Sequence, residues 1–151
     1  MDQSRAAHGL SAYRPGTRFA AKASVPAEAE YHFLLGRYVD AATLARAFAL
    51  AAAWGVHPHD VLIANGWLDA DDYYRALADV AGVPFKSGFT AGDTMLPAKA
   101  SPRQCLAAGL LKERAGAGRF VLAPDRLRPN ALRAVLAQLG PRGFALTTPH
   151  A

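Results

Sequence analysis

The segment from Leu44 to Phe85 alternates short amphipathic stretches with turn residues, and this alternation is the strongest constraint on the fold. Apolar side chains recur within each stretch at three- and four-residue spacing, which is the periodicity of a helix with one buried face. Glycines close the stretches, as is common where a helix ends in a left-handed residue. The pattern therefore predicts several short helices packed into a small bundle.

Four helical segments are expected in the first half of the chain. Asp40 and Asp69 are suitable N-caps, Pro58 suits a first helical turn, and Gly55 and Gly82 are suitable stops. The expected helices span residues 27–36, 41–54, 58–65 and 70–81. Their predicted buried faces contain Leu44, Phe48 and either Ala51 or Ala52 in the second helix and Tyr73, Leu77 and Val80 in the fourth. The glycine turns at Gly36 and Gly66 form a weak internal repeat of helix, turn and helix.

The pattern changes after Phe85. We expect a loop to Pro97, a short helix over 101–108, strands over 110–114 and 119–123, a helix over 129–139 and a final strand over 144–148. The face of the last helix is predicted from Leu132, Val135, Leu136 and Leu139. The fold class is α+β, with a small helical bundle followed by an α+β unit whose sheet has about three strands. We divide the chain into a flexible arm (1–26), a helical subdomain (27–85), a linker (86–95) and an α+β subdomain (96–151).

Composition favours a soluble cytoplasmic domain. The single cysteine, Cys105, has no internal disulfide partner, and the longest apolar run, Ala47 to Trp54, is too short for a membrane span. The net charge is +5, and nine basic against two acidic residues lie in 97–151, whereas residues 25–96 contain four basic and nine acidic. This asymmetry indicates either two mutually attracting halves, a basic face for an anionic partner, or solvated surfaces.

No catalytic or metal-binding constellation is recognisable, so we expect no enzyme activity and no cofactor in this chain. His57 and His59 lack the i, i+4 spacing of helical metal ligands, and with Asp60 they are interpreted as a helix start. Asp69, Asp71 and Asp72 lack the glycine and distal glutamate of a calcium loop, so capping is preferred. Nucleic-acid binding is not expected, because aromatic residues are not interleaved with the basic ones.

A family resemblance rests on two sets of residues. The first is Leu62, Gly66, Leu68, Tyr73 and Leu77, followed by Gly82-Val83-Pro84-Phe85; the second is Leu96-Pro97, Arg119 to Pro124 and Ala145 to Pro149. Residues 36–149 resemble the N-terminal domain of type II secretion and type IV pilus assembly ATPases. They resemble more closely the version found in bacterial family 2, cellulose-synthase-like glycosyltransferases.

The resemblance implies a non-catalytic domain that regulates or docks a membrane glycosyltransferase for polysaccharide synthesis or export. The partner would be a downstream catalytic or membrane domain of a parent protein, or a separate protein. The chain would be located in the cytoplasm, or at the inner membrane where a parent protein holds it there. The alternative is a stand-alone anion or nucleotide sensor of the secretion-ATPase type.

Some members of the secretion-ATPase family bind cyclic di-GMP through an Arg-Leu-Gly stretch. Here the matching positions hold His57-Pro58-His59 and Ala27-Glu28-Ala29, so we do not expect cyclic di-GMP to be a partner. The candidate ligand-binding residues are His57, Arg119, Arg126, Arg128 and Arg133. Trp54 and Trp67 are interpreted as core anchors, with the alternative that one is exposed as an interaction residue.

Overall fold

The computed structural model describes residues 27–88, 90, 92–99, 101–114, 118–125 and 127–149. The expected arm over residues 1–26 and the candidate residue Arg126 lie outside the described residues.

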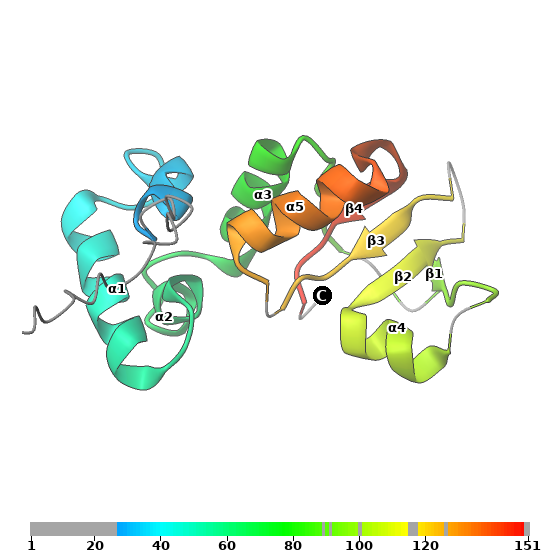
Figure 1. The fold of residues 1–151 in the computed structure, drawn as a ribbon, viewed down its shortest axis with the longest axis horizontal. Helices are drawn as coiled ribbons and strands as arrows, with labels where there is room; N and C mark the ends of the chain where they lie inside the picture. The colour runs from blue at the N-terminus through cyan, green and yellow to red at the C-terminus, as the bar shows by residue number, and fades with distance from the viewer. Residues whose placement is uncertain are drawn as a thin grey trace, which may run out of the picture.

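Four helical segments form the first half. They are the 3-10 helix η1 (Ala29–Leu34) and the helices α1 (Ala41–Trp54), α2 (Pro58–Ala64) and α3 (Ala70–Ala81). Helices α1 and α2 pack side by side at one end of the molecule, and α3 lies between them and the sheet (Figure 1). The predicted segments are confirmed, although the first is a 3-10 helix.

The helix ends explain why the sequence predicted these boundaries well. The Asp40 carboxylate accepts a hydrogen bond from the Thr43 amide at 2.6 Å, which satisfies a backbone donor that the first helical turn would otherwise leave free. Gly55 and Gly82 end α1 and α3 with φ of 68° and 71°, a left-handed conformation that side chains with a Cβ rarely adopt.

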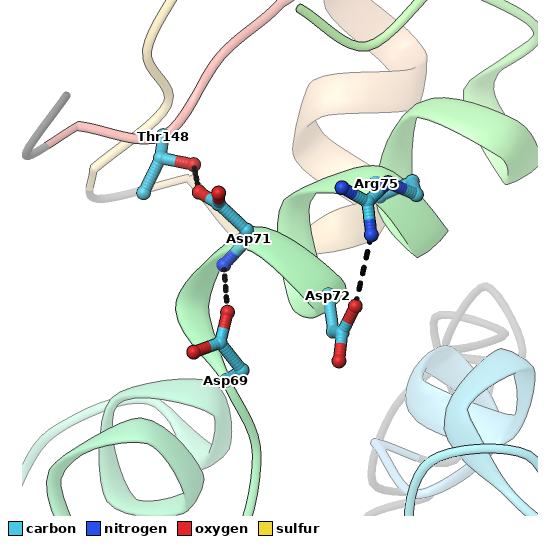
Figure 2. Close-up of polar contacts among 5 residues, drawn as sticks. All are labelled: Asp69, Asp71, Asp72, Arg75 and Thr148. Carbon is cyan, nitrogen blue, oxygen red and sulfur yellow. Dashed lines mark hydrogen bonds and ion pairs between the residues drawn. The ribbon is translucent and has the colours of Figure 1, made fainter. Parts of the chain in front are cut away.

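The first turn of α3 is tied to the C-terminal part of the chain (Figure 2). The Asp69 carboxylate caps the helix by accepting from the Asp71 amide at 2.8 Å, and Asp72 pairs with Arg75 at 3.0 Å. The Asp71 carboxylate accepts a hydrogen bond from the Thr148 hydroxyl, which lies just beyond the last strand. The capping interpretation of these aspartates is thus confirmed for Asp69, and Asp71 makes a tertiary contact.

The second half contains a four-stranded sheet in the order β1-β2-β3-β4. Its elements are β1 (Thr94–Met95), α4 (Pro102–Ala108), β2 (Leu110–Glu113), β3 (Phe120–Leu122), α5 (Pro129–Leu139), the 3-10 turn η2 (Pro141–Gly143) and β4 (Phe144–Leu146). The pairs β1–β2 and β2–β3 are antiparallel, whereas β3 and β4 are parallel and α5 connects them. The α+β class is confirmed.

The sheet differs from the prediction by one strand. Thr94 and Met95 pair with Glu113 and Lys112 inside the stretch expected to be a linker. Two residues are too few to show the alternating pattern of a strand, so the sequence carried no signal for β1. At the opposite edge of the sheet, the Leu146 amide donates to the Pro84 carbonyl at 2.9 Å and the Lys86 amide donates to the Leu146 carbonyl at 2.8 Å. The segment that follows α3 therefore lies alongside β4.

One hydrophobic core joins the two halves. Tyr31 and Leu77 from the helical half and Leu132, Leu136 and Leu146 from the second half belong to the same buried cluster. Helix α3 contacts both α5 and β4, as the central position of α3 and α5 in Figure 1 shows.

Two residues predicted to face the core are exposed instead. Val80 is 38% exposed and borders an open groove beside α5, and Leu139, the last residue of α5, is 62% exposed. Both residues lie in the last turn of their helices. The apolar face of each helix extends into this turn, but the rest of the fold does not cover it there.

Candidate functional site: stacked rings at the start of α2

Helix α2 begins with a reciprocal cap. His57 is the N-cap, its side chain accepts from the Asp60 amide, and its own amide donates to the Asp60 carboxylate at 3.0 Å. Pro58 occupies the first helical position, where the missing N–H costs nothing. The interpretation of this stretch as a helix start is therefore confirmed.

Three nearly parallel rings form a column that leads inward from His57. The His57 and His59 ring centroids are 5.3 Å apart with 12° between their planes, and those of His59 and Tyr73 are 4.7 Å apart with 8°. His59 and Tyr73 are fully buried, whereas His57 is partly exposed. The column therefore starts at the surface with His57 and ends in the core.

The His59 imidazole is held in one orientation by Tyr31. The Tyr31 hydroxyl forms a hydrogen bond with His59 Nδ1 at 2.9 Å, and burial raises the pKa of Tyr31, so this phenol keeps its proton. His59 Nε2 is 3.5 Å from an Asp60 carboxylate oxygen and forms no hydrogen bond within the described residues. Burial lowers the pKa of His59 to about 4, because the charged imidazolium is poorly solvated there, and the opposing effect of Asp60 is smaller.

Three further buried side-chain atoms have no hydrogen-bond partner in the described part of the chain. These atoms are Tyr73 Oη, Arg128 Nε and Thr147 Oγ1. Burial also raises the pKa of Tyr73, and the Tyr31 hydroxyl raises it further by a smaller amount.

A buried carboxylate connects η1 to the start of α5. Glu30 Oε2 accepts from Arg128 Nη2 at 2.6 Å, and Glu30 Oε1 accepts from the Asn130 amide at 2.8 Å. The Asn130 amide belongs to the first turn of α5, where a negative charge is favourable. Sequence analysis did not identify Glu30, Tyr31 or Tyr73 as site residues, because their partners are distant along the chain.

The predicted ligand-binding residues occupy different elements. His57 is the outer ring of the column, and Arg128 lies close enough for its charge to act on the pKa of His59. Arg119 precedes β3, where its amide donates to Glu113 at 3.4 Å, and Arg133 borders the groove between α3 and α5. The structure thus places His57 in the ring column and Arg128 within electrostatic reach of His59, and it places Arg119 and Arg133 elsewhere.

The two tryptophans also differ from each other. Trp67 packs partly buried against the core, and the Arg46 guanidinium lies 5.1 Å from its ring centroid. Trp54 is 58% exposed and is not a core anchor, because α1 ends at this residue and the chain turns at Gly55.

Two negative observations apply to the described part of the chain. No helix there has the length and apolar character needed to traverse a bilayer. No group of three or more His, Cys, Asp or Glu side chains in these ranges is arranged to hold a metal ion.

Comparison with known proteins identifies the fold. No protein-family model and no curated protein matches the sequence. Among solved structures, MshE with cdg (cyclic di-GMP) matches with a TM-score of 0.54 and 18% sequence identity, covering 84% of this chain and 93% of that chain. The fold is therefore related to that of the N-terminal region of a type IV pilus or secretion ATPase.

This match bears on two expectations. The glycosyltransferase part of the resemblance receives no support from MshE. The expectation that cyclic di-GMP is not a partner is contradicted, because a structure that shares the fold over most of its length is a complex with that nucleotide. The replacement of Arg-Leu-Gly by His57-Pro58-His59 was too local a reason for excluding the ligand.

Proposed function

We propose that this chain is a non-catalytic regulatory domain of the secretion-ATPase type that senses cyclic di-GMP in the cytoplasm. The observation that carries the proposal is the fold match to MshE with cdg, which extends over 84% of this chain. The supporting observation within the chain is the ring column, whose outer member stands at the position where the resemblance puts the arginine of the nucleotide-binding stretch.

The column offers stacking in place of an arginine contact. A guanine base has a flat π-face, and aromatic side chains are common platforms for bases. A base placed on the partly exposed His57 would continue the order His57, His59, Tyr73, whose planes differ by 12° and 8°. The cap to Asp60 and the contact with His59 fix the His57 side chain before a ligand arrives, which lowers the entropy cost of binding.

The phosphates require a cation, and Arg128 is the candidate nearest to the column. Its side chain is 43% exposed even while Nη2 contacts Glu30. Arginine is suited to phosphate because its planar donors bind two oxygens at once. In this proposal His57 receives the base and Arg128 receives a phosphate.

Isothermal titration calorimetry with cyclic di-GMP at neutral pH tests the proposal. We expect a dissociation constant in the micromolar range or tighter, and at least tenfold weaker binding for His57→Ala. His32→Ala is the matched control, because His32 is an exposed histidine of the same half that makes no ring contact in the described structure. Absence of binding by the wild-type chain at high micromolar ligand refutes the proposal, and equal affinity of His57→Ala refutes the stacking role.

Docking to a membrane glycosyltransferase is the second candidate, and the exposed end of α1 favours a docking role. Trp54 and Val56 are 58% and 44% exposed within three residues of each other, and exposed tryptophans are frequent interface anchors. A tagged chain recovered from its native cells should then bring down a membrane glycosyltransferase, and Trp54→Ser should not. Recovery of a secretion ATPase instead would count against this candidate.

A further inference from the structure

The arginine assigned to the ligand phosphate is already paired with a carboxylate of its own chain. Arg128 Nη2 donates to Glu30 Oε2 at 2.6 Å, and the other oxygen of this carboxylate accepts from the Asn130 amide at 2.8 Å. The Arg128 side chain is 43% exposed, whereas the Glu30 side chain is 4% exposed. A dissolved anion can therefore reach the arginine, and it meets a cation whose counter-charge is fixed in the protein interior.

This counter-charge opposes the binding of a second anion. Charges that are buried are screened little by salt and water, so the Glu30 carboxylate offsets much of the positive potential of Arg128. Carboxylate and phosphate are alternative partners for a guanidinium, because both accept hydrogen bonds from its planar N–H donors. Two anions on one guanidinium repel each other, and the repulsion is strong where the dielectric constant is low. A phosphate that binds Arg128 must therefore compete with Glu30.

The competing carboxylate belongs to a segment that also holds the ring column. The next residue, Tyr31, forms a hydrogen bond with His59 Nδ1 at 2.9 Å, and His59 stacks on His57. Burial raises the pKa of Tyr31, the charge of Glu30 raises it further, and the charge of Arg128 lowers it, so both members of the ion pair act electrostatically on this hydroxyl. The short helix η1 thus connects the start of α5 to the column.

We propose that Glu30 is an internal competitor for Arg128, so that a phosphate bound to Arg128 displaces the carboxylate and loosens the junction between η1 and α5. The inference rests on the proposed function, in which Arg128 receives a phosphate of cyclic di-GMP. Coupling of this kind is reciprocal. The factor by which the Glu30 contact weakens ligand binding is also the factor by which the ligand weakens the contact.

Isothermal titration calorimetry with cyclic di-GMP at neutral pH compares matched variants. Glu30→Gln removes the charge but keeps the size of the side chain and an oxygen that can accept from the Asn130 amide. We expect it to bind at least tenfold more tightly than wild type. Glu28→Gln is the control, because it makes the same change of charge at an exposed position two residues away and should leave the affinity unchanged. Adding Arg128→Gln to Glu30→Gln should abolish the gain.

Hydrogen exchange of the wild-type chain gives a readout that does not depend on the folding of Glu30→Gln. The Tyr31 amide in η1 donates to the Glu28 carbonyl at 3.1 Å, and the Leu44 amide at the start of α1 donates to the Asp40 carbonyl at 3.0 Å. Saturating cyclic di-GMP should accelerate exchange of the Tyr31 amide, by up to the factor that calorimetry gives for Glu30→Gln. Exchange of the Leu44 amide should not become faster.

The outcomes separate this inference from the proposed function. Binding by wild type with equal or weaker binding by Glu30→Gln overturns the competition and leaves the proposed function intact. Binding by Glu30→Gln without binding by wild type supports the competition and refutes only the proposed function. Absence of binding by both overturns both. An equal gain in Glu28→Gln, a gain that persists without Arg128, or unchanged exchange of the Tyr31 amide in the wild-type complex also overturns the competition.

Discussion

Tyr31 Oη and His59 Nδ1 lie 2.9 Å apart in the protein interior, although 28 residues separate them in the sequence. This hydrogen bond connects η1 to α2 and fixes a histidine that is fully buried. Since burial lowers the pKa of His59 to about 4, the folded chain keeps this imidazole neutral under conditions in which the unfolded chain protonates it.

The first prediction is a loss of stability in mild acid. Above about pH 6.5, His59 is neutral in both the folded and the unfolded chain, so it contributes no pH dependence. Between about pH 6.5 and about pH 4, only the unfolded chain binds a proton at His59. The free energy of unfolding therefore falls as the pH falls through this range. A pKa lowered from 6.5 to about 4 corresponds to a loss of roughly 3 kcal/mol. Urea unfolding followed by circular dichroism across this range measures the slope.

Two variants separate His59 from the other titrating groups. His59→Phe keeps an aromatic ring but removes the proton-binding site, so its stability should depend less on pH in this range. His32→Gln should retain the wild-type slope, because His32 is exposed. If His59→Phe shows the same slope as wild type, the pH dependence has another origin.

The second prediction concerns Glu30, which joins η1 to Arg128 and to the Asn130 amide. Glu30→Ala should lower the free energy of unfolding by roughly 2–3 kcal/mol, because it removes two hydrogen bonds to a buried carboxylate and leaves Arg128 without its partner. Glu28→Ala, an exposed glutamate two residues earlier, should change it by about 0.5 kcal/mol or less. Chemical denaturation measures both, and similar losses for the two variants would contradict the role of the pair.

Local signals in the sequence predicted most helix boundaries. Asp40, Gly55, Asp69 and Gly82 act through neighbouring backbone groups, so their effect can be recognised without knowledge of the fold. The burial of Leu77 followed in the same way from helical spacing. These elements were predicted because each depends on interactions within a few residues.

The candidate site could not be predicted in this way. His59 has no local feature that distinguishes a buried histidine from an exposed one, and its partner Tyr31 is 28 residues away. Glu30 is 98 residues from Arg128. The ring column could not be predicted from the sequence either, because it forms only where α2 and α3 meet in the fold. Residues whose environment is set by tertiary contacts need a structure before their role can be assigned.

The third prediction concerns Gly109, the turn between α4 and β2. A Cβ at this position would lie 2.3 Å from the Ala123 carbonyl oxygen, and the φ of 62° is itself unfavourable for other residues. Gly109→Ala should therefore cost about 3 kcal/mol or more, because strain and a backbone clash add. Gly66→Ala isolates the strain: Gly66 has φ of 67° but open space around it, so about 1 kcal/mol is expected. Equal melting temperatures for the two variants would mean that the chain relieves the clash by a small shift.

The last prediction compares a buried leucine in α3 with an exposed leucine in α5. Leu77 is fully buried where α3 faces the common core, and Leu77→Ala should lower the free energy of unfolding by about 2–5 kcal/mol through lost burial and the cavity left behind. Leu139 is 62% exposed at the end of α5, so Leu139→Ala should change it by about 0.5 kcal/mol or less. Urea denaturation measures both values.

Because the core containing Leu77 joins both halves, its loss should lower the midpoints reported by tryptophan fluorescence in the helical half and by far-ultraviolet circular dichroism together. Separate midpoints for the two probes would show that the halves unfold independently.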